Sequence, residues 1–351
     1  MNFDAILTSE TVLLDLRSPE EFSKGAFPNS VNLPLLDDEQ RRQVGICYKA
    51  HGQQAAVDLG NQLINPELKT ARIHHWLNVL NEHPDALLYC WRGGLRSRTV
   101  KRWLSEAGRE VPVIPGGFKA LRSWCLDYFE NLPKQQEFLI IAGRTGSGKT
   151  PFINQFFNSI DLEGLANHRG SAFGRKTSEQ PSTINFEHAL AIALLRIDTQ
   201  QSIIVEDESR IIGRLAIPQS LFNRMSEAPV LVLESTLQER SLRIFEEYVA
   251  QPLLSHDSTR EQLQNRYLAA LERIKRRLGG QRCADITESL QQAFALEAGE
   301  AEFVANHLVW IEKLLNWYYD PMYDYQLSRK QDRVILTGDC STIESYLRQR
   351  N

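Results

Sequence analysis

The chain has 351 residues, which predicts two domains because a single hydrophobic core rarely grows beyond about 250 residues. Its 42% hydrophobic and 24% charged residues are ordinary for a globular protein, and no run approaches the roughly 18 apolar residues of a membrane-spanning helix. A net charge of −4 excludes a general attraction to nucleic acid, although a local basic stripe would suffice for binding. The five cysteines include no C-x-x-C pair, which disfavours a zinc site or a disulfide scaffold. We expect a cytoplasmic protein without a membrane partner, because the first residues lack the pattern of a signal peptide.

The first third of the chain alternates short apolar runs with helical segments. A helix is expected after Ser18, with Pro19 in its first turn. Such alternation predicts a parallel sheet with helices on both faces and functional residues at the carboxyl ends of its strands. Residues 36–70 look helical and form an insertion to which composition assigns no role. The strands expected here are 11–17, 31–34, 87–90 and 111–114.

A polar stretch at 130–136 separates this region from an apolar strand at 138–142. We therefore expect an amino-terminal domain over residues 1–132 and a second α/β domain over residues 137–351. Further strands are expected at 202–205 and 229–233. Beyond about residue 236 the pattern becomes mainly helical, and Pro321 is expected to break the long helical run.

Cys90 ends an apolar strand and is followed by a glycine-rich loop that contains two arginines. Gly93 and Gly94 let the backbone amides turn towards the sulfur. These donors, with Arg92 and Arg96, favour the thiolate and would hold an anionic atom bonded to it. The pattern therefore predicts a catalytic cysteine loop made of Cys90, Arg92 and Arg96.

Cys90 has two other interpretations. Its spacing from Arg96 also fits a cysteine phosphatase, but those enzymes normally carry histidine before the cysteine, where this chain has Tyr89. The structural alternative is a buried thiol beside a simple turn. The other four cysteines are expected to be ordinary thiols.

Residues 143–150 match the pattern G-x-x-x-x-G-K-[ST] at every fixed position, between an apolar strand and a segment, 151–157, that is expected to be helical. Backbone amides and the helix N-terminus would cradle phosphate oxygens, Lys149 would neutralise their charge, and Thr150 could bind Mg²⁺. The pattern predicts a diphosphate or triphosphate ligand without saying what the phosphates are attached to. The predicted phosphate-binding residues are Gly143, Thr145, Gly146, Ser147, Gly148, Lys149 and Thr150.

Three acidic residues follow the strand expected at 202–205. A phosphate loop commonly works with an acid at the end of a buried strand, and Glu206 or Asp207 is the expected acid on the metal side. The alternative is a charged strand end in solvent.

A later helix is expected to begin at Ser258, where Ser258 and Glu261 suggest a capping box, and to end at Gly279-Gly280. It carries an apolar stripe bordered by an arginine row that could follow an RNA backbone. The alternative is a solvated helix face. The stripe is Leu263, Tyr267, Leu271, Ile274 and Leu278, and the row is Arg266, Arg273 and Arg277.

Several motifs together resemble a known family. Asp15–Phe22 and Gly25–Pro34 resemble the opening of a rhodanese domain, and Gly116–Leu121 resembles its closing glycine turn. Trp91 replaces the basic residue that commonly follows a rhodanese cysteine, which disfavours simple thiosulfate sulfurtransferase activity. Residues 90–94 with Arg96 and Ser97 match one subgroup, the tRNA 2-selenouridine synthases, which join a rhodanese domain to a carboxy-terminal P-loop domain. Residues 165–174 resemble a further segment of that family, and there the resemblance assigns His168, Arg169 and Ser171 to the substrate or metal side of the site.

The resemblance implies an α/β chain with a rhodanese-like parallel-sheet domain and a P-loop domain with a helical extension. It implies replacement of the sulfur of wobble 2-thiouridine by selenium in tRNAs of the Lys, Glu and Gln type. The P-loop domain is implicated in S-geranylation from geranyl diphosphate, and Cys90 in selenation from selenophosphate, with selenium carried on its sulfur. No tightly bound cofactor is expected, Mg²⁺ is an expected cation, and contact with a selenophosphate-supplying enzyme is an expected partnership.

Two other classes of function stay open. One is a sulfurtransferase fused to an ATP-dependent kinase or NTPase, which nucleotide turnover without RNA would indicate. The other is a nucleotide-gated RNA-binding module, for which Cys90 would be dispensable.

Overall fold

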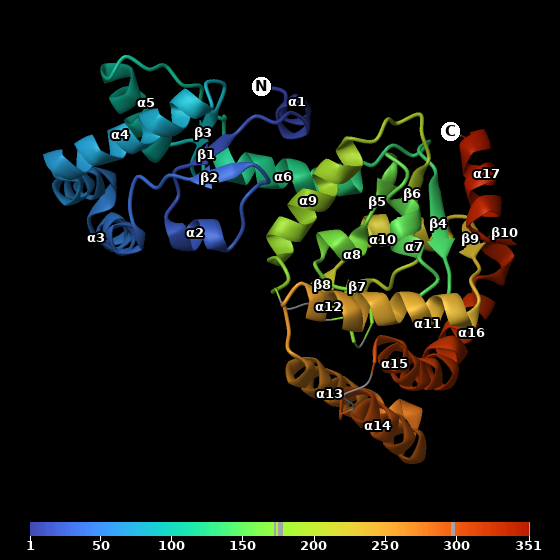
Figure 1. The fold of residues 1–351 in the computed structure, drawn as a ribbon. Coiled ribbons are helices and arrows are strands. Elements are labelled where there is room, and N and C mark those ends of the chain that lie inside the picture. Colours follow the sequence, from blue (N-terminus) through green and yellow to red (C-terminus); the bar gives the residue numbers. More distant parts are fainter. Residues whose placement is uncertain (172, 175–177, 296–298, 351) are drawn as a thin grey trace. The chain divides into compact units, whose positions relative to one another are not determined.

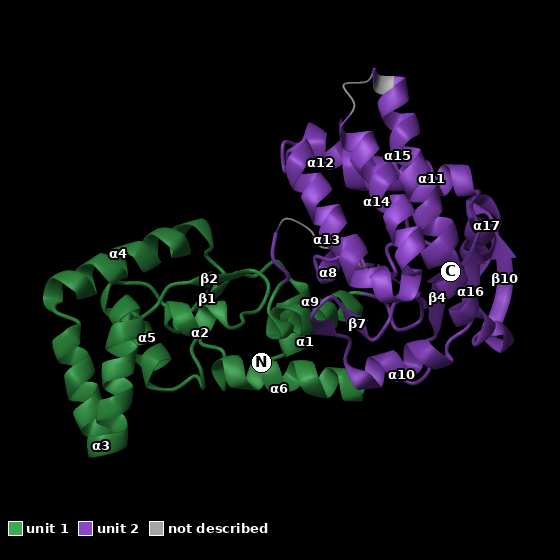
Figure 2. Cartoon of the chain, turned by 90° about the horizontal axis from the view of Figure 1, so that it is seen from below, with its two compact units in different colours: residues 1–132, 181–196 green, residues 133–180, 197–351 purple. Residues whose placement is uncertain are grey.

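The computed structural model describes residues 1–171, 173–174, 178–295 and 299–350 (Figure 1). They form two compact units, which Figure 2 colours separately. The first unit comprises Met1–Leu132 and Pro181–Arg196, and the second comprises Pro133–Gln180 and Ile197–Asn351.

The first unit is built on a three-stranded parallel sheet in the order β2-β1-β3. Leu13 of the central strand pairs with Ser30 on one side and with Leu87 on the other. The elements of this unit are α1 (Phe3–Thr8), β1 (Leu13–Asp15), α2 (Pro19–Ser23), β2 (Ser30–Asn32), α3 (Asp38–Leu63), α4 (Pro66–Glu82), β3 (Leu87–Tyr89), α5 (Leu95–Glu106), α6 (Gly117–Glu130) and α9 (Thr183–Leu195).

The strand expected at 111–114 is reduced to a single parallel bridge between Val113 and Leu88. Leu88 N donates to Pro112 O at 2.9 Å, and Ile114 N donates to Leu88 O at 2.8 Å. Pro112 has no N–H to continue a ladder, and Pro115 follows directly, so pairing stops after these two hydrogen bonds. The expected strand was therefore too long.

The expected helical insertion is confirmed as α3 and the start of α4. Asp37 caps α3 in a capping box with Gln40. Gly52, with a φ of 81°, interrupts the helical conformation and divides α3 into two arms. The core between these helices and the sheet contains Trp76 of α4, which stacks on Trp103 of α5 with ring centroids 6.2 Å apart.

Helix α9 comes from the middle of the phosphate-loop region of the sequence but packs on the first unit, beside α6 (Figure 2). The Asn185 side chain accepts a hydrogen bond from Ala26 N at 2.7 Å. Buried His188 stacks on Phe27 with ring centroids 3.6 Å apart, and its Nδ1 lies 2.9 Å from Ala26 O. The observed units thus differ from the expected domains, 1–132 and 137–351, at residues 181–196.

The second unit is built on a five-stranded parallel sheet in the order β10-β9-β4-β6-β5. Its strands and its first helices are β4 (Phe138–Ala142), α7 (Lys149–Ile153), β5 (Ser159–Ile160), α8 (Leu162–Leu165), β6 (Ile203–Glu206), α10 (Gln219–Glu227), β9 (Val230–Leu233) and β10 (Val334–Gly338). A small antiparallel pair joins β7 (Ile211–Ile212) to β8 (Leu215–Ala216). The parallel α/β architecture of both units confirms the predicted fold class.

Strand β10 was not expected from the sequence, which looked mainly helical after residue 236. It pairs with β9 at the edge of the sheet, and helix α17 (Cys340–Arg350) lies beside it (Figure 1). Its side chains alternate between half-buried and exposed, which is the period of an edge strand and is a weak signal over only five residues.

The helical extension consists of four helical stretches, and the first and the last of them contain a π-helical turn. They comprise α11 (Leu237–Phe245), η1 (Glu246–Ala250), α12 (Gln251–Leu254), α13 (Arg260–Leu278), α14 (Gly280–Ala295), α15 (Glu300–Leu314), η2 (Leu315–Tyr319) and α16 (Asp320–Ser328), and a short 3₁₀ turn, η3 (Gln331–Arg333), precedes β10.

Pro321 does not break its helical run, which corrects the expectation. The run passes through η2, where Asp320 N donates to Leu315 O five residues earlier, and Pro321 lies in the first turn of α16. Pro252 has the same setting after η1, where Gln251 N donates to Glu246 O. A wider turn before the proline relieves the clash that its ring would make with the carbonyl four residues back.

The cap of helix α13 lies one residue later than expected. Its cap is Thr259, paired in a capping box with Gln262, and Ser258 instead accepts a hydrogen bond from Arg266 at 3.0 Å. The whole predicted apolar stripe is buried, from Leu263 to Leu278, and forms the core of the helical extension with residues of α14 and α15.

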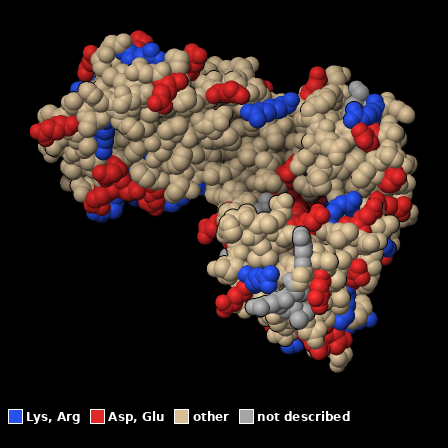
Figure 3. All heavy atoms as spheres, viewed as in Figure 1, with Lys and Arg blue, Asp and Glu red and all other residues tan. Residues whose placement is uncertain are grey.

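Surface charge is mixed. On the face shown in Figure 3, basic and acidic side chains of the described residues are interspersed, and they form no large basic area there. None of the described helices combines the length and the hydrophobicity that crossing a membrane requires.

Candidate active site

The cysteine loop joins the end of β3 to the start of α5. Cys90 is buried, and its carbonyl accepts a hydrogen bond from Phe118 N at 2.8 Å. Gly117, with a φ of 59°, has no room for a side chain because a Cβ there would lie 2.1 Å from Cys90 O. The closing glycine turn therefore packs directly against the loop, and this close approach explains the glycine.

Arg96 lies in an ion pair rather than free beside the sulfur. Its Nη1 is 2.6 Å from Glu21 Oε2, and Glu21 also accepts from Ser18 N in the capping box of α2. Burial tends to raise the pKa of Glu21, but the hydrogen bond and charge of Arg96 hold it below its ordinary value. The two arginines expected at the sulfur thus have different surroundings, and only Arg96 is paired with Glu21.

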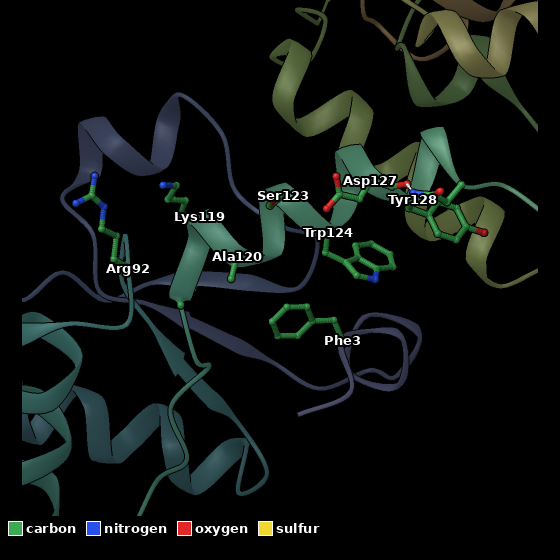
Figure 4. A pocket seen from close by; sticks show the side chains of 10 residues that line it. Phe3, Arg92, Lys119, Ala120, Ser123, Trp124, Asp127 and Tyr128 are labelled. Atoms are coloured by element: carbon green, nitrogen blue, oxygen red, sulfur yellow. Dashed lines mark hydrogen bonds between the residues drawn. The ribbon is translucent and has the colours of Figure 1, made fainter.

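Arg92 lines two hollows of the first unit. One contains Cys90, and the other runs along α6, where Figure 4 shows Arg92 and Lys119 near one another and Phe3 near Trp124. Lys119 N also donates to Trp91 O at 2.9 Å, which ties the start of α6 to the cysteine loop.

A buried ion pair that the sequence analysis did not single out supports this region. Arg17 donates to Asp15 at 2.6 to 3.0 Å, and both side chains are almost fully buried. The Arg17 guanidinium lies 3.8 Å from the ring centroid of Phe118, which stacks in turn on Trp91. The pair connects the end of β1 to the cysteine loop. In the sequence, the only indication of this ion pair was the Asp15–Phe22 motif, which contains both residues.

The helical insertion has a clear place at this site. Helix α3 and the cysteine loop together line a cavity of about 900 Å³, and Cys90 is one of its lining residues. The insertion therefore covers the predicted catalytic cysteine.

The phosphate loop follows β4, the central strand of the larger sheet. Lys149 Nζ donates to Gly143 O at 3.0 Å, across the loop. Gly148, with a φ of 85°, caps α7 in the left-handed region that favours glycine. The segment predicted to be helical, 151–157, is helical only to Ile153, and the helix already begins at Lys149.

Two arginines of α11 hold the outer side of the phosphate loop. Arg243 donates to the carbonyls of Gly146 and Ser147 at 3.3 and 3.2 Å. Arg240 donates to Thr145 O at 3.2 Å and forms a buried bidentate ion pair with Asp320. Because the C=O and N–H of one peptide point in opposite directions, the amides that follow these carbonyls face away from α11. Sequence reasoning missed both arginines, whose only signal was their spacing of three on one helix face.

The structure distinguishes the two candidate acids after β6. Thr150 Oγ1 donates to Glu206 Oε2 at 2.9 Å, and Glu206 is fully buried. Asp207 is instead ion-paired with Lys330. Of the two, it is Glu206 that directly contacts the phosphate loop.

Glu206 belongs to a cluster of carboxyl groups. Burial and the neighbouring Glu163 and Glu208 raise the pKa of Glu206 well above its ordinary value. Burial and Glu163 also raise the pKa of Glu208 to about 8. A cation beside the cluster would stabilise the ionised carboxylates.

The hydroxyl of Thr150 and the carboxylate of Glu206 fit Mg²⁺, which prefers oxygen ligands and commonly combines one or two carboxylates with phosphate oxygens. Among the described residues, no group of three or more His, Cys, Asp or Glu side chains is arranged to hold a metal ion by itself. Such a cation would therefore depend on the phosphates for part of its coordination.

The segment after α8 lies partly at this site. Arg169 and Ser171 line the cavity of the phosphate loop, and Arg169 pairs with Glu247 at 3.3 Å and lies over the ring of Tyr248. His168 is half-buried and is not one of the residues that line this cavity.

The three arginines of the predicted row on α13 have different surroundings. Arg266 is half-buried and is bonded to Ser258, whereas Arg273 is exposed. Arg277 is exposed and lines the phosphate-loop cavity. The row is therefore not a uniform solvated face.

The phosphate-loop cavity measures about 700 Å³ and has a mixed lining. One part of the lining consists of the loop, Lys149 and the carboxyl cluster. The cavity also contains aromatic and apolar side chains from residues at and beside the two π-helical turns, together with Glu246, Glu247 and Gln251. The aromatic and apolar members include Ile244, Tyr248, Tyr318, Tyr319, Met322 and Tyr323.

Comparison with known proteins identifies a matching family model for each of the two units. Residues 3–123 match the family model of the rhodanese-like domain, and residues 136–351 match that of the tRNA 2-selenouridine synthase AAA domain. The chain is 44% identical over 353 residues to the tRNA 2-selenouridine synthase of Shewanella frigidimarina, covering 98% of this chain and 96% of the relative. It is 45% identical over 361 residues to that of Alcanivorax borkumensis, covering 99% and 98%. These matches span nearly the whole chain, which therefore belongs to the tRNA 2-selenouridine synthase family.

Proposed function

We propose that this chain replaces the sulfur of 2-thiouridine at the wobble position of tRNA with selenium, in two steps that use two sites. The observation that carries the proposal is one chain in which a phosphate loop shares a cavity with several aromatic side chains in one unit, and a covered cysteine loop lies in the other. Membership of the tRNA 2-selenouridine synthase family supports the choice of substrate. The tRNAs are those of the Lys, Glu and Gln type, the protein acts in the cytoplasm, and a selenophosphate-supplying enzyme is its partner.

The first step is S-geranylation in the phosphate-loop cavity. The thiocarbonyl sulfur attacks C1 of geranyl diphosphate, a C–S bond forms, and diphosphate leaves with the electron pair of the broken C–O bond. The amides of the phosphate loop and Lys149 stabilise the charge that develops on the leaving group. Mg²⁺, when bound at Thr150 and Glu206, would supply further positive charge to the same oxygens.

The prenyl group explains the aromatic and apolar side chains of this cavity. Diphosphate alone needs hydrogen-bond donors and cations, and it gains nothing from apolar side chains such as Ile244 and Met322 or from the ring faces of Tyr318 and Tyr319. An allylic chain attached to the diphosphate would bury its apolar surface against these side chains.

The second step takes place at Cys90. Alkylation converts a poor sulfur leaving group into a good one, so the selenium of selenophosphate, held at Cys90, adds at C2 of the pyrimidine. The geranyl thiolate leaves with the electron pair of the broken C–S bond and takes up a proton. Water then cleaves the P–Se bond, so that phosphate is released and the selenium stays on C2. The buried position of Cys90 would keep water away from the selenium during this transfer.

Mass spectrometry of tRNA nucleosides after incubation with geranyl diphosphate and selenophosphate tests the proposal. The Cys90→Ala variant should accumulate geranylated 2-thiouridine and form no 2-selenouridine. The Lys149→Ala variant should make neither product from 2-thiouridine, yet it should selenate tRNA that has been geranylated beforehand. Cys340→Ala is the matched control, because this cysteine is exposed and lies outside both sites.

Two results would contradict the proposal. Normal 2-selenouridine formation by the Cys90→Ala variant would show that the cysteine is not required for selenation. Turnover of ATP without RNA, together with no reaction of geranyl diphosphate, would favour a sulfurtransferase fused to an NTPase.

A further inference from the structure

The cavity beneath the helical insertion is larger and more apolar than the transfer of selenium from selenophosphate requires. We propose that this cavity binds the geranyl chain of the alkylated wobble nucleoside during the step at Cys90. The inference rests on the proposed function, since it assigns a binding site to the intermediate of that reaction.

Exposed apolar side chains gather in this cavity. Ile46 and Tyr48 of α3 are 55% and 56% exposed, and Trp91 and Leu95 of the cysteine loop are each 41% exposed. Single exposed apolar residues are common on protein surfaces, but here two segments distant in sequence bring four of them into one cavity with Cys90. Such a grouping indicates an apolar ligand.

The chemistry of selenophosphate does not account for these side chains. It is a small oxyanion, which is held by hydrogen-bond donors and cations and is not stabilised by apolar walls. The cavity of about 900 Å³ lies at the upper end of the range of ligand pockets, which accommodates a nucleoside together with a ten-carbon chain.

Charge complementarity favours a nucleoside within RNA. Five basic side chains line the cavity, but Arg41 and Arg96 share Glu21, and Arg42 is paired with Glu39. The two remaining are Lys49 and Arg92, and neither has a carboxylate partner among the residues that the structure describes. Cations of this kind suit the phosphates that flank a nucleoside in RNA.

The shape of α3 explains how the insertion forms this wall. The left-handed Gly52 allows the chain to fold back between two helical arms. Val44 and Ile46 come from the first arm, and Ala56 and Val57 come from the second, and all four line the cavity. The insertion thus acts as an apolar cover of the cysteine loop.

Binding of two synthetic anticodon stem-loop RNAs to the full-length chain tests this inference. The RNAs are identical except that one carries S-geranyl-2-thiouridine and the other carries 2-thiouridine. Fluorescence anisotropy should show that the unmodified chain binds the geranylated RNA about tenfold more tightly, because the chain buries apolar surface. The Ile46→Ser/Tyr48→Ser variant should lose most of this preference, and its thermal stability should be little changed because both side chains are already exposed.

Leu126→Ser is the matched control, because Leu126 is a large apolar residue of the same unit that is 44% exposed and does not line the cavity. It should retain the full preference. A double variant that keeps the preference, or an unmodified chain that shows none, would overturn the inference. If the preference is present and is lost in the double variant while geranyl diphosphate proves inert, the inference stands and only the first step of the proposed function fails.

Discussion

Neighbouring residues at the end of one strand have separate roles in the second unit. Glu206 ends strand β6 and Asp207 follows it, and both line the phosphate-loop cavity, but their side chains have different partners. Glu206 accepts from Thr150, whereas Asp207 is paired with Lys330. The two positions therefore provide a matched pair of variants.

We predict that Glu206→Gln lowers the rate of geranylation by on the order of a hundredfold, because it removes the carboxylate that would face a cation and the departing diphosphate. Folding should be preserved, since the amide has the same shape and burial already raises the pKa of Glu206. Asp207→Asn should change the geranylation rate by less than about threefold, because a partly exposed ion pair contributes only about 0 to 1 kcal/mol. Rates from nucleoside mass spectrometry check both values. A larger loss for Asp207→Asn than for Glu206→Gln would reverse the assignment.

At the scale of elements, α9 adds a pH-sensitive contact to the first unit. Burial lowers the pKa of His188 from 6.5 to about 3, so the folded protein keeps this ring neutral. In the unfolded chain the ring binds a proton near pH 6.5. The unfolded state thus binds more protons between these values, and the stability contributed at neutral pH is lost as the pH falls from about 6.5 towards 3.

We predict that protonation linked to His188 removes about 2 kcal/mol of stability between pH 7.5 and pH 5. Urea unfolding at the two pH values measures this difference. The His188→Asn variant should be less stable at pH 7.5 but should lose about 2 kcal/mol less than the unmodified chain on acidification. His75→Asn, at an exposed histidine of the same unit, should behave as the unmodified chain. Equal acid sensitivity of His188→Asn and the unmodified chain would contradict the prediction.

The arginine row on helix α13 has one half-buried member, Arg266, and two exposed members, Arg273 and Arg277. We predict that Arg273→Ala/Arg277→Ala weakens binding of all tRNAs alike and makes the slope of log affinity against log salt shallower by about 0.7 to 0.9 per lost phosphate contact. Arg266→Ala should instead lower the melting temperature, because this half-buried side chain is bonded to Ser258. Salt titrations of tRNA binding and thermal unfolding separate the two effects.

Arg276→Ala is the control for this helix, since Arg276 is exposed and lies about 60° to 100° around the helix from the members of the row. If a folded Arg273→Ala/Arg277→Ala variant shows an unchanged slope of log tRNA affinity against log salt, this part of α13 is a solvated face without a role in recognition.

At the scale of the whole molecule, the chain passes between the two units three times, at residues 132–133, 180–181 and 196–197. The cysteine loop belongs to the first unit and the phosphate loop to the second. Each proposed step uses one of these sites, so the steps should be separable.

We predict that a mixture of full-length Cys90→Ala and Lys149→Ala recovers formation of 2-selenouridine that neither variant performs alone. The first variant would geranylate the tRNA, and the second would selenate it after transfer through solution. Nucleoside mass spectrometry at increasing protein concentration measures the recovery, and either variant mixed with the Cys90→Ala/Lys149→Ala double variant is the control. No recovery at any concentration would mean that the intermediate is not released between the steps.

Local features of both sites could be recognised in the sequence. The strand at 138–142, the phosphate loop after it and the helix start at Pro19 are all found as expected. Such features depend on contiguous residues, because a glycine-rich turn, a cap or a buried strand is specified by its neighbours along the chain. The rhodanese-like and P-loop organisation followed from motifs of the same local kind and is confirmed.

The sequence by itself thus determined the two loops, their order and the parallel α/β architecture, since each rests on local patterns of glycine, charge and hydrophobicity. Only the tertiary structure decided that Arg96 pairs with Glu21, that Glu206 rather than Asp207 meets Thr150, and that α9 packs on the first unit. It also decided that the insertion covers Cys90. These contacts join residues far apart along the chain, and their geometry depends on how whole elements pack, which no local pattern encodes.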